Sequence, residues 1–66
     1  MYDKYVTLRD KAGYTDYRVA QETGISKSVF SEWKSGRSVP KIDKLYLIAK
    51  LFNVDLEYFV SNGDSA

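Results

Sequence analysis

The chain contains no cysteine and no histidine, and only one proline and four glycines among its 66 residues. Because neither a disulfide nor a Cys/His zinc site is available, the core has to depend on apolar packing alone. The same absence removes the commonest nucleophile and general base, and domains of this size seldom enclose a substrate pocket. We therefore expect a binding module rather than an enzyme, with no metal, cofactor or small-molecule ligand.

Long apolar runs are also absent. The longest, at residues 45–49 and 58–60, fall far below the roughly 20 residues that a membrane span requires. No signal-peptide pattern opens the chain, so we expect a soluble, cytoplasmic protein that does not bind membranes. Hydrophobic residues nevertheless make up 44% of the chain and aromatic residues 15%. That content is sufficient for one small globular domain and too high for a disordered tail.

Charge is distributed unevenly, although the formal net charge is only +1. Residues 1–26 are neutral overall, residues 27–44 carry a net charge of +3, and residues 45–66 carry −2. The middle segment is therefore the candidate surface for a polyanion. An ordinary solvated face is the alternative interpretation of the same charges.

Apolar residues at helical spacing predict five helices and no strand, which is an all-α fold. The expected helices span residues 2–12, 16–23, 26–35, 42–52 and 55–60. Thr15, Ser26 and Asp55 are the expected N-caps of the second, third and fifth helices. Gly24 and Gly36 follow the second and third helices, where a C-terminal residue with positive φ is wanted.

The remaining segments are expected to be irregular. Gly13 and Asn53 end the first and fourth helices, and the residue before Pro40 is pushed out of the α region, which predicts an extended loop over 37–40. We expect the domain to occupy residues 1–61, with 62–66 as a flexible tail or the start of a linker. The tail is compatible with a natural end and with the cut end of a longer protein.

The second and third helices, joined at Gly24, have the dimensions of a helix-turn-helix motif over about residues 16–35. Ala20, four residues before Gly24, is a small residue that allows the two helices to approach closely. Further motif positions are Leu8-Arg9, Gly13-Tyr14-Thr15, Val19-Ala20, Thr23-Gly24-Ile25-Ser26, Trp33, Ser35-Gly36, Pro40, Leu45, Ile48-Ala49, Phe52-Asn53-Val54 and Leu56. With these residues the chain resembles the phage-repressor and Cro-type (XRE-like) helix-turn-helix proteins over roughly residues 2–60.

This resemblance implies a compact five-helix domain of the lambda-repressor-like fold. Members bind operator DNA, usually as homodimers, and most are bacterial or phage transcriptional repressors or regulators. The third helix is their recognition helix, and its exposed face reaches base edges in the major groove. The resemblance therefore implies base contacts by Lys27, Ser28, Val29 and Glu32.

The chemistry of these side chains suits base contacts. Lys27 can donate to guanine, Ser28 can donate or accept, and Glu32 can accept from cytosine N4, while Val29 can touch a thymine methyl group. For Val29 the alternative is core packing. For Glu32 the alternative is a solvent-facing or intrahelical charge.

The resemblance also implies phosphate contacts from the starts of the second and third helices and from the loop after the third. The expected contacts are Tyr17, Ser26, Lys34, Ser35, Arg37 and Lys41. Arg37 and Lys41 suit this role by charge, and Tyr17 and Ser26 by their hydroxyl groups. By contrast, the apolar spacing of Ile25, Phe30 and Trp33 predicts core packing rather than base stacking.

Two positions depart from the family pattern. Asp16 stands where relatives have a Gln that donates to a phosphate, and a carboxylate would repel that phosphate, so we expect Asp16 to cap and position its helix. Lys34 stands where relatives have a Glu that pairs with the equivalent of Arg9. We hypothesise that Arg9 pairs instead with Glu32 or Glu22, and that Lys34 turns outward to phosphate.

Two functional interpretations follow. The first is a sequence-specific regulator that binds a pseudo-palindromic operator as a dimer, with recognition helices about 34–36 Å apart. Its candidate dimer patch consists of Leu51, Leu56, Tyr58 and Val60. The second is a protein-interaction module, such as an antitoxin or anti-regulator, whose working surface is the acidic C-terminal part. Steep salt dependence of DNA binding distinguishes the first from the second.

Overall fold

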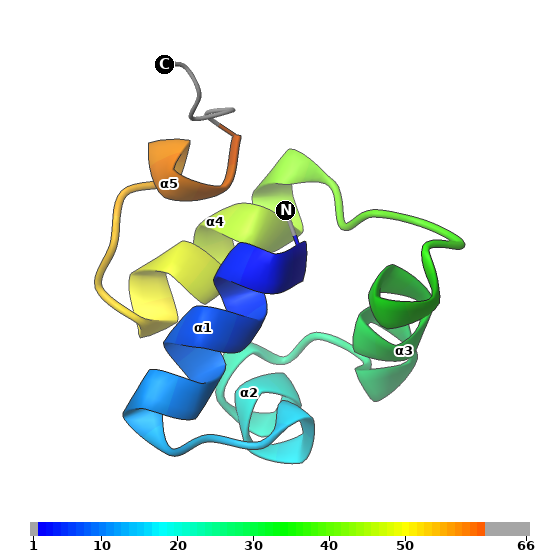
Figure 1. Cartoon of the computed structure of the whole chain (residues 1–66), viewed down its shortest axis with the longest axis horizontal. Helices are drawn as coiled ribbons and strands as arrows, with labels where there is room; N and C mark the ends of the chain where they lie inside the picture. The colour runs from blue at the N-terminus through cyan, green and yellow to red at the C-terminus, as the bar shows by residue number, and fades with distance from the viewer. Residues whose placement is uncertain (1, 61–66) are drawn as a thin grey trace.

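The computed structural model describes residues 2–60, and these residues form five α-helices with no β-strand among them (Figure 1). The helices are α1 (Tyr2–Ala12), α2 (Asp16–Thr23), α3 (Lys27–Ser35), α4 (Ile42–Leu51) and α5 (Glu57–Val60). The predicted all-α, five-helix fold is therefore confirmed, and the helix bounds differ from the predicted ones by no more than a few residues at their ends. Within residues 2–60, no helix combines the length and the apolar character needed to cross a lipid bilayer.

The N-terminal ends of α2 and α3 are capped by the residues that the sequence indicates. Thr15 Oγ1 accepts a hydrogen bond from the backbone N–H of Arg18 at 3.1 Å. Ser26 Oγ accepts from the backbone N–H of Ser28 at 3.4 Å. Each hydroxyl satisfies one of the N–H groups that the first turn of a helix leaves without a partner.

The cap expected at Asp55 is wrong. Its carbonyl, rather than its carboxylate, accepts from the backbone N–H of Tyr58 at 2.9 Å. In the described part of the chain, the Asp55 carboxylate makes no hydrogen bond or ion pair. Because α5 is only 4 residues long, it is stabilised mainly by the packing of its apolar side chains rather than by a cap.

The core joins side chains from all five helices and from the turn between α2 and α3. Its buried residues are Tyr5, Val19, Ile25, Phe30, Trp33, Leu45, Ile48, Ala49 and Phe59. The ring of Tyr5 on α1 stacks on Phe30 and Trp33 of α3, at centroid distances of 5.3 and 5.2 Å. Ile25, Phe30 and Trp33 are thus core residues, as predicted, and the two aromatic residues attach α3 to the rest of the domain.

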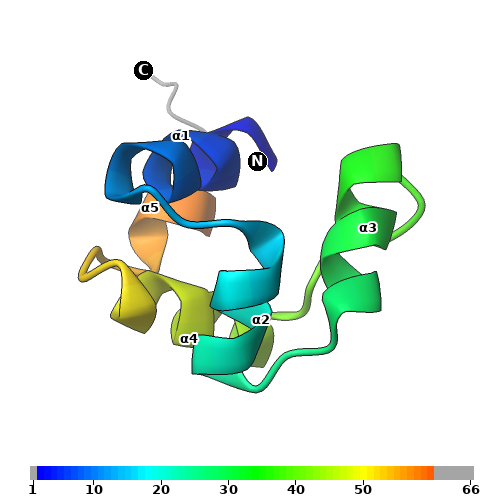
Figure 2. The same ribbon diagram turned by 90° about the horizontal axis from the view of Figure 1, so that it is seen from below.

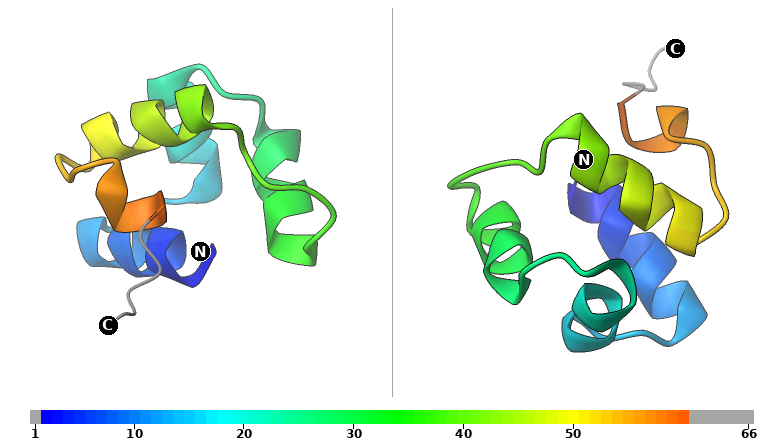
Figure 3. Two further views of the ribbon diagram at one scale, coloured as in Figure 1. Left: turned by 90° about the horizontal axis from the view of Figure 1, so that it is seen from above. Right: turned by 180° about the vertical axis from the view of Figure 1, so that it is seen from behind.

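The helices pack so that α3 stands at one side of the molecule. α5 contacts both α1 and α4, and α2 contacts both α3 and α4; Figure 2 shows α5 between α1 and α4. Both views of Figure 3 show α3 apart from α5, connected to α4 by the long loop after residue 36. Pro40 in this loop is buried. One long side of α3 consequently faces solvent.

Candidate nucleic-acid interface

The turn between α2 and α3 is held at three points. Gly24 adopts a φ of 78° and donates its backbone N–H to the carbonyl of Ala20 at 2.9 Å. The backbone N–H of Ile25 donates to Thr23 Oγ1 at 3.2 Å, and the Ile25 side chain is buried in the core. Because the backbone is hydrogen-bonded and its central side chain is buried, the angle between the two helices is fixed. This arrangement is a helix-turn-helix.

α3 is divided into a buried and an exposed side. Phe30 and Trp33 point into the core, whereas Lys27, Ser28 and Glu32 are exposed. Three of the four predicted base-contacting residues therefore lie on the solvent side of α3. This exposure leaves their polar groups accessible to a ligand.

The fourth, Val29, is half-buried and packs against the core. It also lines a surface hollow together with Val39, Pro40 and Lys44. The Val29 side chain therefore takes part in core packing, which is the alternative to a base contact.

Hydroxyl groups at the start of α3 interact with each other. The Oγ atoms of Ser26 and Ser28 lie 2.9 Å apart, so the N-cap residue and a predicted base-contacting residue share a hydrogen bond. Both residues are exposed. The pair presents adjacent hydroxyl groups at the N-terminal end of α3, where backbone N–H groups favour anions.

The predicted phosphate contacts are all exposed, and they lie on α2, at both ends of α3 and in the following loop. Tyr17 is 59% exposed, and its hydroxyl accepts from Gln21 Nε2 at 3.2 Å. Ser35 Oγ donates to the carbonyl of Glu32 at 3.0 Å. Gln21 is a further polar residue of this surface that the sequence interpretation did not include.

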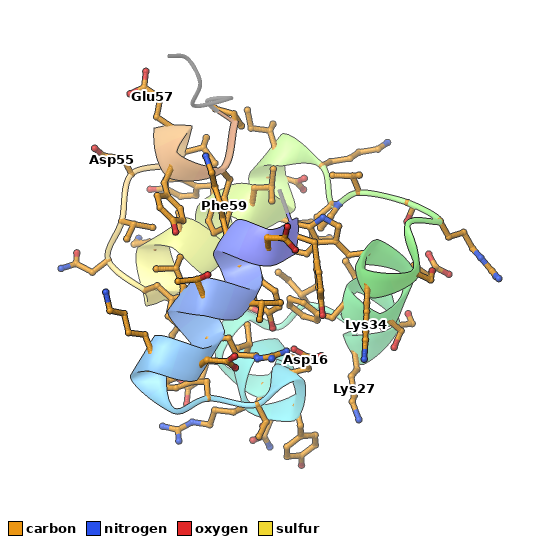
Figure 4. The ribbon with its side chains drawn as sticks, in the orientation of Figure 1. Asp16, Lys27, Lys34, Asp55, Glu57 and Phe59 are labelled. Atoms are coloured by element: carbon orange, nitrogen blue, oxygen red, sulfur yellow. The ribbon has the colours of Figure 1, made fainter. Side chains whose placement is uncertain are left out.

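The cationic side chains of this surface are Lys27, Lys34, Arg37 and Lys41. All four are exposed, and within residues 2–60 none of these side chains forms an ion pair. Lys27 and Lys34 extend from α3 in Figure 4. Because no salt bridge within residues 2–60 has to break before these cations meet an anion, this surface suits a polyanionic ligand.

The hypothesis that Arg9 pairs with Glu32 or Glu22 is wrong. Arg9 Nη1 pairs with Asp16 Oδ1 at 3.0 Å, and its Nη2 pairs with Asp10 Oδ1 at 2.9 Å. Glu22 pairs instead with Arg18, four residues earlier on α2, at 3.2 Å. The reason is that the first residue of α2 faces α1, which brings the Asp16 carboxylate next to the Arg9 guanidinium (Figure 4).

Asp16 also accepts from the hydroxyl of Tyr5, at 2.6 Å on the same Oδ1 atom. Burial, and next the hydrogen bond to Asp16, raise the pKa of Tyr5 above its ordinary value. The hydrogen bond to Asp10, opposed by burial, raises the pKa of Arg9. Tyr5 therefore remains a hydrogen-bond donor, and Asp16 positions α2 against α1, as expected. The expected cap by Asp16 is wrong, because Thr15 is the N-cap of α2 and the Asp16 carboxylate binds side chains of α1.

A residue missed by the sequence interpretation is Ser38. Gly36 adopts a φ of 80°, which reverses the chain so that the backbone N–H of Arg37 donates to the carbonyl of Glu32 at 2.9 Å. The reversal brings Ser38 Oγ to 3.2 Å from Glu32 Oε1. A glycine at the end of a helix is a known signal for this return, and it indicates that the residues just after Gly36 lie beside the last turn of α3.

The acidic C-terminal part forms a second polar area on another side of the molecule. Asp55 and Glu57, labelled in Figure 4, line a surface hollow together with Asn53, Val54 and Tyr58. In the described residues, no group of three or more His, Cys, Asp or Glu side chains has an arrangement that could hold a metal ion.

A helix-turn-helix family model matches residues 7–59 of the chain. The chain is 34% identical over 59 residues to the HTH-type transcriptional regulator SutR of Escherichia coli, covering 89% of this chain and 33% of that protein. It is 29% identical over 62 residues to the HTH-type transcriptional activator BcrR of Enterococcus faecalis, covering 94% and 30%.

A third relative is the uncharacterized HTH-type transcriptional regulator YobD of Bacillus subtilis, with 30% identity over 57 residues and coverage of 86% and 51%. The chain thus spans between about 30% and about half of the length of these curated relatives. No solved structure matches the chain significantly.

Proposed function

Because the chain belongs to the helix-turn-helix family, we propose that it is a DNA-binding transcriptional regulator that reads its operator with α3. The observation that carries this proposal is the exposed side of α3. Polar side chains there adjoin four cationic side chains that form no ion pair within residues 2–60. In this proposal, residues that read bases and residues that bind phosphates share one surface.

In this proposal Lys27, Ser28 and Glu32 contact base edges in the major groove. Lys27 donates to guanine O6 and N7, and Glu32 accepts from cytosine N4. Val29 contributes a methyl contact to thymine with its exposed part. Since each good base contact discriminates by about 1–3 kcal/mol, these residues determine which sequence is chosen.

The phosphate contacts set affinity rather than sequence choice. We assign them to the following exposed residues of α2, α3 and the adjoining loop: Tyr17, Ser26, Lys34, Ser35, Arg37 and Lys41. Arg37 and Lys41 flank the loop after α3, so they approach the backbone beside the groove that α3 enters. Asp16 is not among the phosphate contacts because its carboxylate has no proton to donate and repels a phosphate; it pairs with Arg9 of α1 instead.

The regulator acts, in our proposal, as a homodimeric repressor on a pseudo-palindromic operator. Occupancy of an operator blocks transcription without any further protein contact, so DNA binding by α2 and α3 is enough to support repression. A two-fold dimer places its recognition helices in successive major grooves, about 34–36 Å apart.

The dimer patch expected from the sequence needs revision. Leu51, Leu56 and Tyr58 are partly buried against the core, and only Val60 of the four is an exposed large apolar residue. Ile42 and Tyr46, one turn apart on α4, are 62% and 52% exposed. We therefore assign the contact with a second copy to the outer side of α4 together with Val60.

A second candidate function is a protein-interaction module of the antitoxin or anti-regulator kind. The observation that favours it is the hollow beside Asp55 and Glu57, which offers negative charge to a basic partner. This function requires no DNA binding. DNA binding with steep salt dependence therefore contradicts it as the main role.

The test is selection from a randomised duplex pool by the 66-residue protein at about 50 and 200 mM salt. Lys27→Ala and Arg37→Ala are run beside it, with Lys11→Ala, an exposed lysine at the end of α1, as the matched control. We expect an enriched inverted repeat whose sequence changes for Lys27→Ala. Arg37→Ala should weaken binding to every site and reduce the salt slope by about one. Absence of any enriched sequence would contradict the proposed function.

A further inference from the structure

Glu32 is the only acidic residue of α3, and it is exposed on the side of that helix proposed to meet DNA. Like charges repel, so a carboxylate brought close to phosphate groups lowers affinity unless it meets a donor. Among base edges in the major groove, the amino group of cytosine is the donor that Glu and Asp accept from. Glu32 therefore lowers the affinity for DNA unless it accepts a hydrogen bond from a cytosine, and in that case it favours cytosine at one position of the operator.

The path of the chain after α3 gives the Glu32 side chain a hydrogen-bond partner. Its carbonyl accepts from the backbone N–H groups of Arg37 and Ser38, at 2.9 and 3.4 Å, because the chain reverses at Gly36. The same reversal places the Ser38 side chain beside the Glu32 side chain. Ser38 Oγ donates to Glu32 Oε1 at 3.2 Å.

Within residues 2–60 this is the one hydrogen bond to the Glu32 carboxylate, and no cation pairs with it. An ionised carboxylate only accepts, and it has two oxygens. With Oε1 occupied by a neutral hydroxyl, Oε2 stays available and the negative charge is not neutralised. A lysine or arginine in place of Ser38 would compete with a base for this charge.

We propose that Ser38 is a positioning residue for sequence specificity, which holds the Glu32 carboxylate so that its free oxygen accepts from a cytosine amino group. This inference rests on the proposed function, since it assigns a base preference to the same DNA-binding surface. A free Glu side chain loses rotamer entropy when it is fixed on a base. Ser38 reduces this loss because it restricts the side chain before DNA binds.

The two serines near Glu32 provide a matched comparison. Ser35 Oγ also donates to Glu32, but to its backbone carbonyl, at 3.0 Å. Ser35→Ala therefore removes a neighbouring hydroxyl without changing the partner of the carboxylate. Ser38→Ala removes the carboxylate's partner, and Ser38→Thr retains a hydroxyl at the same position.

The experiment measures binding of the 66-residue protein and its variants to duplexes selected by the unsubstituted protein, with every base tested at each position. We expect Glu32→Gln to change a cytosine preference to adenine, because Gln pairs with adenine N6 and N7. Ser38→Ala should reduce the preference for cytosine at this same position by about fivefold, a fraction of the discrimination of one base contact. Ser38→Thr should restore it.

Ser35→Ala is expected to weaken binding to all duplexes by the same factor. In the Glu32→Ala background, Ser38→Ala should have no further effect on base preference, because the two residues act as a unit. Circular dichroism checks that each variant remains helical.

Full cytosine preference in Ser38→Ala would overturn the inference, as would a change at a position that Glu32→Gln does not affect. In both cases the unsubstituted protein still selects a sequence, so the proposed function stands. Failure of the unsubstituted protein to select any sequence contradicts the proposed function itself, which distinguishes the two results.

Discussion

Arg9 and Asp16 join the first two helices through a 3.0 Å salt bridge between a guanidinium nitrogen and a carboxylate oxygen. Both side chains are mostly shielded from solvent, with exposed fractions of 22% and 28%. The same carboxylate oxygen accepts from the hydroxyl of the buried Tyr5 at 2.6 Å. One acidic residue therefore fixes the start of α2, and with it the helix-turn-helix, relative to α1.

Asp16→Asn is expected to lower the free energy of unfolding by about 1–3 kcal/mol, because it replaces two charge-assisted hydrogen bonds by weaker ones. Urea denaturation followed by circular dichroism measures this change. Asp10→Asn is the matched control, since it removes the other carboxylate from Arg9 at a site that is 63% exposed. Its effect should stay below about 1 kcal/mol. Equal effects of the two variants would contradict the positioning role of Asp16.

The raised pKa of Tyr5 predicts that the protein loses stability at alkaline pH. Burial and the hydrogen bond to Asp16 raise its pKa above the ordinary value of 10.0, so above that pH the unfolded chain releases a proton that the folded protein retains. The contribution of Tyr5 to the free energy of unfolding is fully present below pH 10. Above that pH this contribution should fall by about 1.4 kcal/mol per pH unit. Tyr5→Phe should lose this contribution. Urea denaturation of the unsubstituted protein and of Tyr5→Phe at about pH 9, 10 and 11 tests this prediction. An identical pH dependence of stability in the two proteins would disprove it.

Most of the fold follows from the sequence because its signals are local. Thr15 and Ser26 cap helices through N–H groups two or three residues away, and Gly24 and Gly36 end helices with positive φ. Asn53 does the same at the end of α4, with a φ of 59°. Each of these features depends on a residue type and its immediate neighbours, so no knowledge of tertiary packing is needed.

The partners of Arg9 and Glu32 could not be derived in this way. Several carboxylates lie within reach of a long arginine side chain, and the choice of Asp16 depends on how α1 and α2 pack. The contact of Ser38 with Glu32 depends on the path of the chain after Gly36. The sequence therefore indicates which residues face the candidate DNA surface, whereas the hydrogen bonds among them require the packed structure.

Gly36→Ala should destabilise the protein by about 1–2 kcal/mol, because a residue with a Cβ is strained at this backbone conformation. Apart from Gly36 and its two chain neighbours, no residue of the described chain has an atom within 4 Å of the position where a Cβ would stand, so the effect arises from the backbone alone. Gly36→Asn should destabilise the protein less, since Asn adopts positive φ more readily, as Asn53 does in this chain. Thermal denaturation of both variants measures the difference, and equal melting temperatures would contradict this explanation.

Trp33 is the only tryptophan of the chain, and it is 4% exposed. Its ring packs against Tyr2 and Tyr5 at centroid distances of 5.4 and 5.2 Å. A tryptophan in the core does not reach a base, so its emission wavelength should be unchanged when DNA binds and should shift to the red when urea unfolds the protein.

Trp33→Phe should lower the free energy of unfolding by about 1–3 kcal/mol. Under conditions where that variant is folded, its affinity for DNA should equal that of the unsubstituted protein. A blue shift on DNA binding, combined with weaker binding but unchanged stability in Trp33→Phe, would instead place the ring at the DNA surface and contradict its role in attaching α3 to the core.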